Sequence, residues 1–478
     1  KRKRIMTIVL FFALYSGSAL ASHMDITNFY SRDFFDFGQN KGVFQPGATD
    51  ISILKKDGTI LSLPEVPFPD FSPVSNKGAT TAIGGAYSVT ASHNGTKHHA
   101  VSTQNWGQSS YKFVDRMTSG DFAVPRLDKF VVETTGTTEG ADISLSKAQA
   151  LERYGINYKG KKQLIAFRAG AGSLTFQKDG RITQASSYSY SPDILNGSFV
   201  LIDDWSGGRV TTNNLFDEFK DRTTGGDSGS ALFVYDNLAK KWVILGTLFG
   251  ENYYNNGQIR SAFNKWDNNL VSSLKQHFTQ NIVLNGENGV INDNKIKRSN
   301  NQQEDNIGKD KDLYFTGGGK IYLSQNLDTG AGGLIFDNGH QYVLEGDGFS
   351  FKGAGVDIGK NTVVDWHIKG VPGDNLHKVG EGTLHIHEKQ GNNLKAGNGT
   401  VVLGVSNAFN NIYLAGGPGK VVLNANNALS GLNEFGGVYF SEKGGVLDLN
   451  GYNQSFGKIA ATDIGTVITN SAEKTSSL

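Results

Sequence analysis

Short apolar runs separated by Gly, Asn and Asp fill residues 311–478, and this texture restricts the possible folds more than any other feature of the chain. The runs are short and alternate apolar with polar positions, as in 321–323, 384–386 and 401–403. Many short strands with turn residues between them and no helical pattern indicate a solenoid. We predict a right-handed parallel β-helix with two or three strands per coil, in which each rung depends on its neighbours. A β-sandwich is the alternative.

Residues 22–285 have a different texture, with short β-like runs and most of the aromatic residues. Three segments in this part carry helix signals: 33–40, 146–154 and 268–278. Residues 286–310 are polar and lack an apolar period, which predicts a linker or loop. The chain is therefore predicted to be mostly β, with one domain at 22–285 and a β-helix at 311–478.

The first 21 residues have the pattern of an export signal. Residues 1–4 are all basic, residues 5–14 are mostly apolar, and residues 19–21 read Ala-Leu-Ala, a small-residue cleavage pattern. The apolar stretch is too short for a stable membrane span. We expect residues 1–21 to be the C-terminal part of a longer leader. The protein would then leave by the Sec route to the periplasm and reach the cell surface and the medium.

Composition agrees with export and argues against one class of partner. The 478 residues include no cysteine, which suits a chain that must cross an outer membrane unfolded. With 46 basic and 45 acidic residues the net charge is close to zero, so no nucleic-acid partner is implied.

Residues 226–230 read Gly-Asp-Ser-Gly-Ser and indicate a nucleophilic serine, Ser228, on a tight turn. The glycines let the backbone bend sharply and leave N–H groups free to face an attacked carbonyl. The apolar run 231–235 predicts a buried strand, and 242–246 predicts its hairpin partner. Glycine turn, strand and hairpin together are typical of a chymotrypsin-like nucleophile loop.

A serine hydroxyl needs a base, and His93 is the best candidate among the ten histidines. It follows the strand-like run 85–92, which is similar to the "strand, Thr-Ala, x, His" pattern of chymotrypsin-like proteases. His98 and His99 lie in a polar stretch that predicts a solvated loop.

The base needs an acid to orient it, and Asp121 is the first choice. It begins the run 121–127, Asp-Phe-Ala-Val-Pro-Arg-Leu, and an acid at the start of an apolar strand can be buried against an imidazole. Asp128 is the second candidate on the same segment. The order His, Asp, Ser along the chain is that of the chymotrypsin clan.

Several segments together resemble the serine protease autotransporters of the Enterobacteriaceae. The resemblance runs from about residue 24 to the end of the chain and rests on segments 68–73, 84–90, 127–134, 150–155, 226–230, 351–355 and 447–456. It implies the N-terminal part of a passenger domain, with a chymotrypsin-like double β-barrel followed by the β-helix. These proteins normally end in a membrane β-barrel, which this chain does not include.

The resemblance assigns roles to the candidate residues. His93, Asp121 and Ser228 take the triad positions, and the N–H groups of Gly226 and Ser228 would form the oxyanion hole. An extended substrate would pair with the strand containing Thr247, Leu248, Phe249 and Gly250. Arg222, six residues before Ser228, lies near the place where the floor of the specificity pocket is set.

We therefore expect a secreted, monomeric serine endopeptidase that cleaves extracellular or host proteins. The alternative is an adhesin whose β-helix binds a host ligand while the protease fold is only a carrier. No cofactor and no metal site are expected. His385 and His387 alternate with apolar residues and face the same way, but no third ligand is evident, so we interpret them as surface histidines.

Asp227 raises the question of activation, because trypsin-like zymogens pair this acid with a newly cut N-terminus. No site of that kind precedes the protease body. We expect that no cut inside the body is needed, and that Asp227 is paired with internal donors or with an ammonium group at Ser22.

Overall fold

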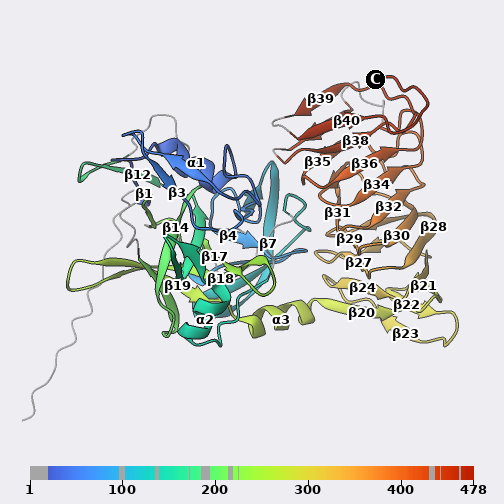
Figure 1. Ribbon diagram of the computed structural model, residues 1–478. Coiled ribbons are helices and arrows are strands. Elements are labelled where there is room, and N and C mark those ends of the chain that lie inside the picture. Colours follow the sequence, from blue (N-terminus) through green and yellow to red (C-terminus); the bar gives the residue numbers. More distant parts are fainter. Residues whose placement is uncertain are drawn as a thin grey trace, which may run out of the picture.

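The computed structural model describes residues 20–95, 103–134, 139–171, 173–184, 194–213, 219–223, 225–429, 436–441, 443–461 and 465–478. The predicted signal segment at 1–21 lies almost wholly outside these residues. The described chain forms a mixed, mostly β N-terminal part and a long C-terminal solenoid, which lie side by side (Figure 1). In the described residues, no helix is both long and apolar enough to cross a membrane.

A closed six-stranded antiparallel barrel forms the larger half of the N-terminal part. Around the barrel the strands are β11 (Ile165–Gly170), β14 (Asn196–Asp204), β15 (Arg209–Asn213), β19 (Ile259–Lys265), β18 (Lys241–Tyr253) and β17 (Ala231–Asp236). The predicted hairpin is present as β17 and β18, with Tyr235 paired to Trp242. Its position matters because β17 begins just after the Gly-Asp-Ser-Gly turn.

The other half is a five-stranded antiparallel sheet. Its order is β4 (Thr80–Ala82), β5 (Ser88–Ala91), β8 (Phe122–Leu127), β7 (Ser109–Ser119) and β6 (Thr103–Trp106). A four-stranded sheet lies beside the barrel and consists of β13 (Arg181–Gln184), β12 (Ser173–Lys178), β1 (Leu20–Asp25) and β16 (Asp221–Thr223). Two hairpins complete the part, β2 (Ser52–Leu54) with β3 (Ile60–Ser62) and β9 (Ile156–Tyr158) with β10 (Lys161–Gln163).

All three predicted helices are present, as α1 (Ser31–Gln39), α2 (Lys147–Tyr154) and α3 (Asn268–His277). Helix α1 buries Phe34, Phe35 and Phe37, and the ring of Phe37 lies 5.4 Å from that of Phe167 in the barrel. This aromatic face explains why a short helix is stable here, since burial of its apolar side supplies what intrinsic propensity does not.

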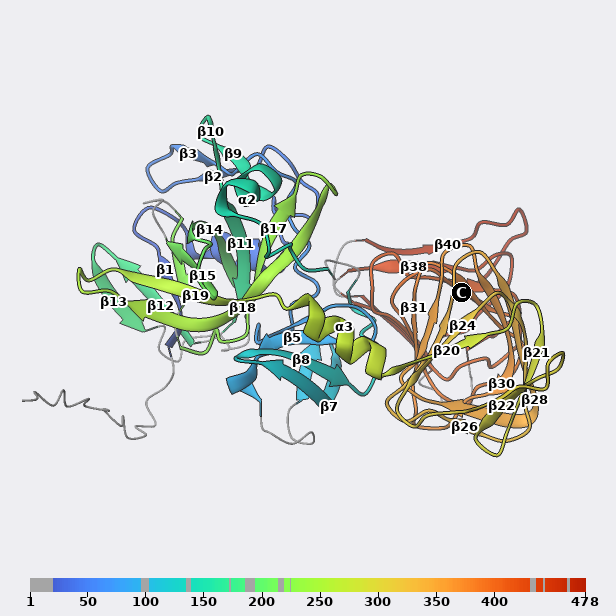
Figure 2. The same cartoon turned by 90° about the horizontal axis from the view of Figure 1, so that it is seen from below.

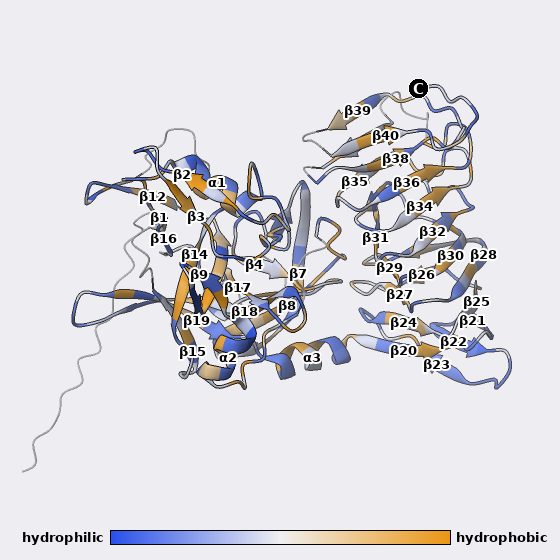
Figure 3. Ribbon diagram, viewed as in Figure 1, coloured by the Kyte–Doolittle hydropathy of each residue, from blue (hydrophilic) through white to orange (hydrophobic). Residues whose placement is uncertain are grey.

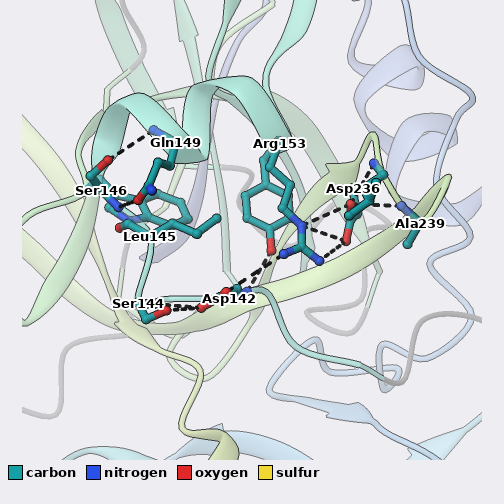
Figure 4. Close-up of polar contacts among 11 residues, drawn as sticks. Asp142, Ser144, Leu145, Ser146, Gln149, Arg153, Asp236 and Ala239 are labelled. Atoms are coloured by element: carbon teal, nitrogen blue, oxygen red, sulfur yellow. Dashed lines mark hydrogen bonds and ion pairs between the residues drawn. The ribbon is translucent and has the colours of Figure 1, made fainter.

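Helix α2 shows the local interactions that fix an element in place (Figure 4). The Ser146 hydroxyl accepts a hydrogen bond from the Gln149 N–H, and the Gln149 side chain accepts one from the Ser146 N–H, which makes a capping box. At the other end Arg153 pairs with Asp236 at 3.0 Å. Asp236 also accepts the N–H groups that follow β17, so α2 is tied to the β17–β18 turn.

The solenoid consists of two long sheets whose strands pair in parallel from rung to rung, which excludes the β-sandwich. One sheet contains β20 (Thr279–Val283), β24 (Asp312–Thr316), β27 (Leu334–Phe336), β29 (Val356–Ile358), β31 (Leu376–Val379), β33 (Leu394–Ala396), β35 (Ile412–Leu414), β37 (Gly437–Phe440) and β39 (Lys458–Ala461). The other contains β23 (Glu304–Asn306), β22 (Lys295–Arg298), β21 (Asn288–Asn292), β25 (Gly319–Leu323), β28 (Gln341–Lys352), β30 (Val363–Lys369), β32 (Thr383–Ile386), β34 (Thr400–Leu403), β36 (Lys420–Leu423), β38 (Gly445–Asp448) and β40 (Thr466–Thr469), and β26 (Leu327–Asp328) pairs with β28.

Apolar side chains stack along the inside of the solenoid from rung to rung. Leu384, Val401, Val421 and Leu447 occupy one column and are fully buried. Figure 2 looks along this axis, and Figure 3 shows hydrophobic colours along the strands. The predicted parallel β-helix is therefore confirmed.

The structure differs from the prediction at residues 286–310, which do not form a simple linker. They contain β21, β22 and β23, an antiparallel extension of the solenoid sheet, and β20 already belongs to the first rung. Ile291 and Ile296 are fully buried there. This hairpin lies at the end of the solenoid and exposes most of its side chains. Few apolar residues therefore mark its strands, and the alternation of apolar and polar residues is too weak to predict them.

Helix α3 connects the two parts and leads directly into β20 (Figures 1 and 2). The junction includes a buried ion pair, in which the guanidinium of Arg126 from β8 donates to Asp312 at 2.8 and 3.1 Å. Phe130 extends the contact, since its N–H donates to the Ala354 carbonyl of the solenoid at 2.9 Å. The strand that follows Asp121 is thus held against the solenoid.

Candidate active site

His93 lies in a single 3-10 turn, Ser92–Asn94, directly after β5. Its Nδ1 is 2.9 Å from Asp121 Oδ1, and its backbone N–H donates to the same oxygen at 3.1 Å. The His93 side chain is 44% exposed and that of Asp121 only 12%. The imidazole is therefore held from one side by a nearly buried carboxylate while the rest of the ring faces outward.

Asp121 rather than Asp128 is the aspartate that faces the imidazole. Its second oxygen, Oδ2, accepts a hydrogen bond from the Asn264 side chain of β19 at 3.0 Å. Asp128 instead accepts the Lys112 N–H at 2.9 Å. The two aspartates lie at opposite ends of β8, about 20 Å apart for an extended strand of this length.

The Ser228 turn is fastened to the segment that bears His93. The Asn94 side chain, one residue after His93, donates to the Ser228 carbonyl and to the Thr90 hydroxyl. Gly229 has φ of +85°, and a Cβ there would lie 2.3 Å from the Ala79 carbonyl oxygen, so only glycine fits. Ser228 is thereby placed next to the histidine turn.

Both residues predicted for the oxyanion hole lie on this turn. Gly226 is exposed and has φ of +105°, and Ser228 is partly buried. The turn is closed by the Ser230 N–H, which donates to the Asp227 carbonyl at 3.0 Å, and by the Gly229 N–H, which donates to the Leu248 carbonyl at 2.9 Å. Glycine at 226 allows the backbone to take a conformation that other residues avoid.

The predicted substrate strand is part of β18, but its four residues are not equally accessible. Thr247 and Leu248 are buried, and the Thr247 hydroxyl donates to the Thr90 carbonyl at 3.2 Å. The pairing of β18 with β19 is irregular between Leu248 and Gly250, at Phe249. The Phe249 ring is 6.2 Å from that of His93, and Phe249 and Gly250 are both partly exposed.

Arg222 lies on β16, where it pairs with His23 of β1. Its Nε is 3.5 Å from Glu251 Oε1 in β18. Arg222 and His23 line an open cavity of about 250 Å³, and Ser228 is not among the residues around it. Arg222 therefore stands beside the β18 segment that follows Gly250, with an acidic partner at its guanidinium.

Asp227 has an internal partner that the sequence did not reveal. The guanidinium of Arg168 in β11 lies 3.5 Å from Asp227 and 3.8 Å from Asp221, and all three side chains are buried. Burial raises the pKa of Asp221 to about 7, against the opposing effect of Arg168. Arg168 thus places a cation beside the Asp227 carboxyl group of the Gly-Asp-Ser-Gly turn. The available signal was a basic residue in the otherwise apolar strand 165–170.

A barrel that presents a histidine–aspartate pair beside a Gly-Asp-Ser-Gly turn, followed by a β-helix, has the architecture of a serine protease passenger domain. Residues 22–268 match the model of peptidase family S6, described as immunoglobulin A1 protease, and the chain belongs to this family.

Named relatives and solved structures agree. The chain is 57% identical over 480 residues to serine protease EspP of Escherichia coli, covering 100% of this chain and 37% of that protein. It is 52% identical over 470 residues to serine protease EspC of Escherichia coli O127:H6, covering 98% of this chain and 36% of the relative. The chain thus spans little more than a third of the length of these relatives.

The structure is similar to the passenger domain of plasmid encoded toxin, an autotransporter enterotoxin from enteroaggregative Escherichia coli. The TM-score is 0.83 at 43% identity, over 95% of this chain and 47% of that one. The Haemophilus influenzae Hap adhesin shares the fold, with a TM-score of 0.77 at 24% identity, over 95% of this chain and 55% of the adhesin.

Proposed function

We propose that this chain is the N-terminal part of an autotransporter passenger and that it hydrolyses peptide bonds with His93, Asp121 and Ser228. The observation that carries the proposal is that the segments bearing His93, Asp121 and Ser228 lie next to one another. Asp121 lies 2.9 Å from His93, and the Asn94 side chain donates to the carbonyl of Ser228. Named serine protease relatives at 52% and 57% identity support the same activity.

The chemistry follows from the orientation of the imidazole. With Nδ1 donating to Asp121, Nε2 is the nitrogen that takes the proton of the Ser228 hydroxyl as Oγ attacks the substrate carbonyl. Asp121 then stabilises the imidazolium, which returns the proton to the leaving amine. A water molecule repeats the sequence on the acyl-enzyme. The Gly226 and Ser228 N–H groups would hold the oxyanion, each contributing about 10²–10³ in rate.

We further propose that the substrate is a protein segment bound in extended form along β18. The accessible residues Phe249 and Gly250 suit a strand that pairs with substrate backbone, while buried Leu248 exchanges backbone hydrogen bonds with Gly229 and Ser230 of the turn. Arg222 with Glu251 is our candidate for a specificity determinant, because Glu251 follows Gly250 on β18 and Arg222 reaches it from β16. The substrates would be extracellular or host proteins, met after secretion of a monomeric passenger.

A covalent inhibitor tests the proposal directly. Phenylmethylsulfonyl fluoride should abolish hydrolysis of a peptide library and leave one label, on Ser228, because only an activated hydroxyl reacts readily. Peptide mass mapping locates the label, and heat-unfolded protein serves as the control that should not react. A chelator should leave hydrolysis unchanged. Labelling at another residue, or inhibition by the chelator, would contradict the proposed mechanism.

Arg168 lies 3.5 Å from Asp227, where trypsin-like proteases place a newly cut N-terminus. We therefore expect activity without a cut inside the protease body. Arg168→Met leaves Asp227 and Asp221 buried without their cation, which should cost about 3–5 kcal/mol of folding free energy. It should also lower kcat/KM, measured at a temperature where circular dichroism shows the variant folded. Arg153→Met is the matched control, because its guanidinium pairs with Asp236 and is a third exposed. A folded Arg168→Met protein with full kcat/KM would show that this pair does not position the nucleophile turn.

A further inference from the structure

Two neighbouring rungs of the β-helix place a group of imidazoles and a carboxylate on their outer face. Asp365 and His367 alternate with buried Trp366 on β30, and His385 alternates with buried Ile386 on β32. Asp365 pairs directly with His385, and Trp366 pairs with Ile386. The next residues in register, His367 and His387, therefore lie side by side.

The side chains converge on one point. His387 Nε2 is 2.7 Å from Asp365 Oδ1, and His385 Nδ1 is 3.6 Å from the same oxygen. The rings of His385 and His387 are 4.0 Å apart, and His367 stacks on His387 at 4.3 Å with 4° between the planes. One ligand atom from each of Asp365, His385 and His387 lies within 4.8 Å of the others, and no other such group occurs in the described parts of the chain.

Partial burial and ring stacking hold these side chains in place. Only 27–30% of these side chains is exposed, which limits the number of rotamers they can adopt. The ligand atoms are thus held together before any ion arrives.

We propose that Asp365, His385 and His387 form a binding site for Zn²⁺ or a similar divalent transition metal on the outside of the β-helix. Imidazole nitrogen and carboxylate oxygen are zinc ligands, and three protein ligands leave the fourth position for water. Zn–N bonds of about 2.0–2.1 Å put tetrahedral ligand atoms about 3.3 Å apart, so small side-chain rotations complete the site. Gly404, which follows β34, keeps the next rung clear, since a Cβ there would lie 3.2 Å from His385 Nε2.

The inference revises the expectation that His385 and His387 have no third ligand. Asp365 lies twenty residues earlier, and only the rung register brings it opposite His385. A metal bound here would join β30 to β32. Because each rung depends on its neighbours, such a link should stabilise the solenoid.

Titration calorimetry with ZnCl₂ tests the site. The parent protein for this test is the full chain carrying His93→Ala, which lacks the imidazole of the candidate active site. This parent should bind about one Zn²⁺ per chain. Asp365→Asn, His385→Gln and His387→Gln should each weaken binding at least about tenfold, since even outer partners of a metal ligand contribute 10–100-fold. His340→Gln is the matched control, because His340 lies 3.0 Å from Asp337 on the same solenoid and is outside the group. Its affinity for zinc should equal that of the parent.

Thermal unfolding gives an independent readout. Zn²⁺ should raise the Tm of the parent and of His340→Gln, and leave that of a protein with both His385→Gln and His387→Gln unchanged. Mg²⁺, which prefers oxygen ligands, should have no effect on any of them. Circular dichroism without metal shows that each variant is folded. A folded parent that binds no zinc, or zinc binding that survives in the double variant, would overturn the proposal.

Discussion

Ser228→Ala should reduce peptide hydrolysis by about 10⁶-fold, because a nucleophile and its base act as one unit and loss of either removes nearly the whole contribution. Stability should change little, since the substitution removes one partly buried oxygen from a turn whose backbone bonds remain. Hydrolysis of a fluorogenic peptide set and thermal unfolding, measured on the same preparations, give both numbers.

Ser206→Ala is the control for the serine variant. Ser206 lies in an exposed turn, where its hydroxyl donates to Asp204 at 2.7 Å. The control should hydrolyse the peptides at the parent rate. Full activity in a folded Ser228→Ala protein would rule out Ser228 as the nucleophile. Absence of hydrolysis by the folded parent protein would instead favour the adhesin alternative, in which the protease fold is only a carrier.

Local signals predicted the elements around the site well. The helix predicted at 146–154 is α2, and its capping box uses Ser146. The strand at 231–235 and its partner are β17 and β18. These features depend on neighbours within a few residues, such as a cap, a glycine turn or an apolar run, and the sequence displays them directly.

Long-range pairing is the part that could not be predicted. Arg168 of β11 meets Asp227 in the turn before the neighbouring strand β17, and Asp365 meets His385 on the adjacent rung. Both contacts depend on strand register, and one residue of slip would turn each side chain to the opposite face. Turn lengths between rungs vary. The sequence therefore predicts that solenoid strands are present, but it does not predict which residues lie opposite each other.

The sequence favoured Asp121 over Asp128, and the spacing along β8 places Asp121 beside His93. Asp121 precedes the strand and Asp128 follows it, so only one of them can reach the turn after β5. The pairing of Ala91 with Phe122 brings that turn beside Asp121. The role of the pair in catalysis remains our proposal, and the aspartate variants test it.

Asp121→Asn should lower kcat by roughly 10⁴-fold, the loss expected when the imidazole is held in the wrong tautomer. Matched replacement at the second aspartate, Asp128→Asn, should change kcat much less, because its oxygen accepts only the Lys112 N–H from the neighbouring strand. Both variants should be compared at saturating peptide, with His93 still present. A larger loss in Asp128→Asn would reverse the assignment of the acid.

The hydrogen bonds around Asp121 favour one orientation of the side-chain amide in the Asp121→Asn variant. Asn264 donates to Asp121 Oδ2 at 3.0 Å, and its own carbonyl oxygen accepts from Arg209 Nε at 3.1 Å. The Asn264 NH₂ is therefore fixed toward residue 121 and favours an asparagine that offers it the carbonyl oxygen, although the new NH₂ then also faces the backbone N–H of His93, which in the parent donates to Oδ1 at 3.1 Å. The new NH₂ then faces His93, where Nδ1 would have to accept, and the proton moves to Nε2. That nitrogen can no longer take the proton of Ser228, so kcat should fall while peptide binding, reported by KM, stays close to the parent value.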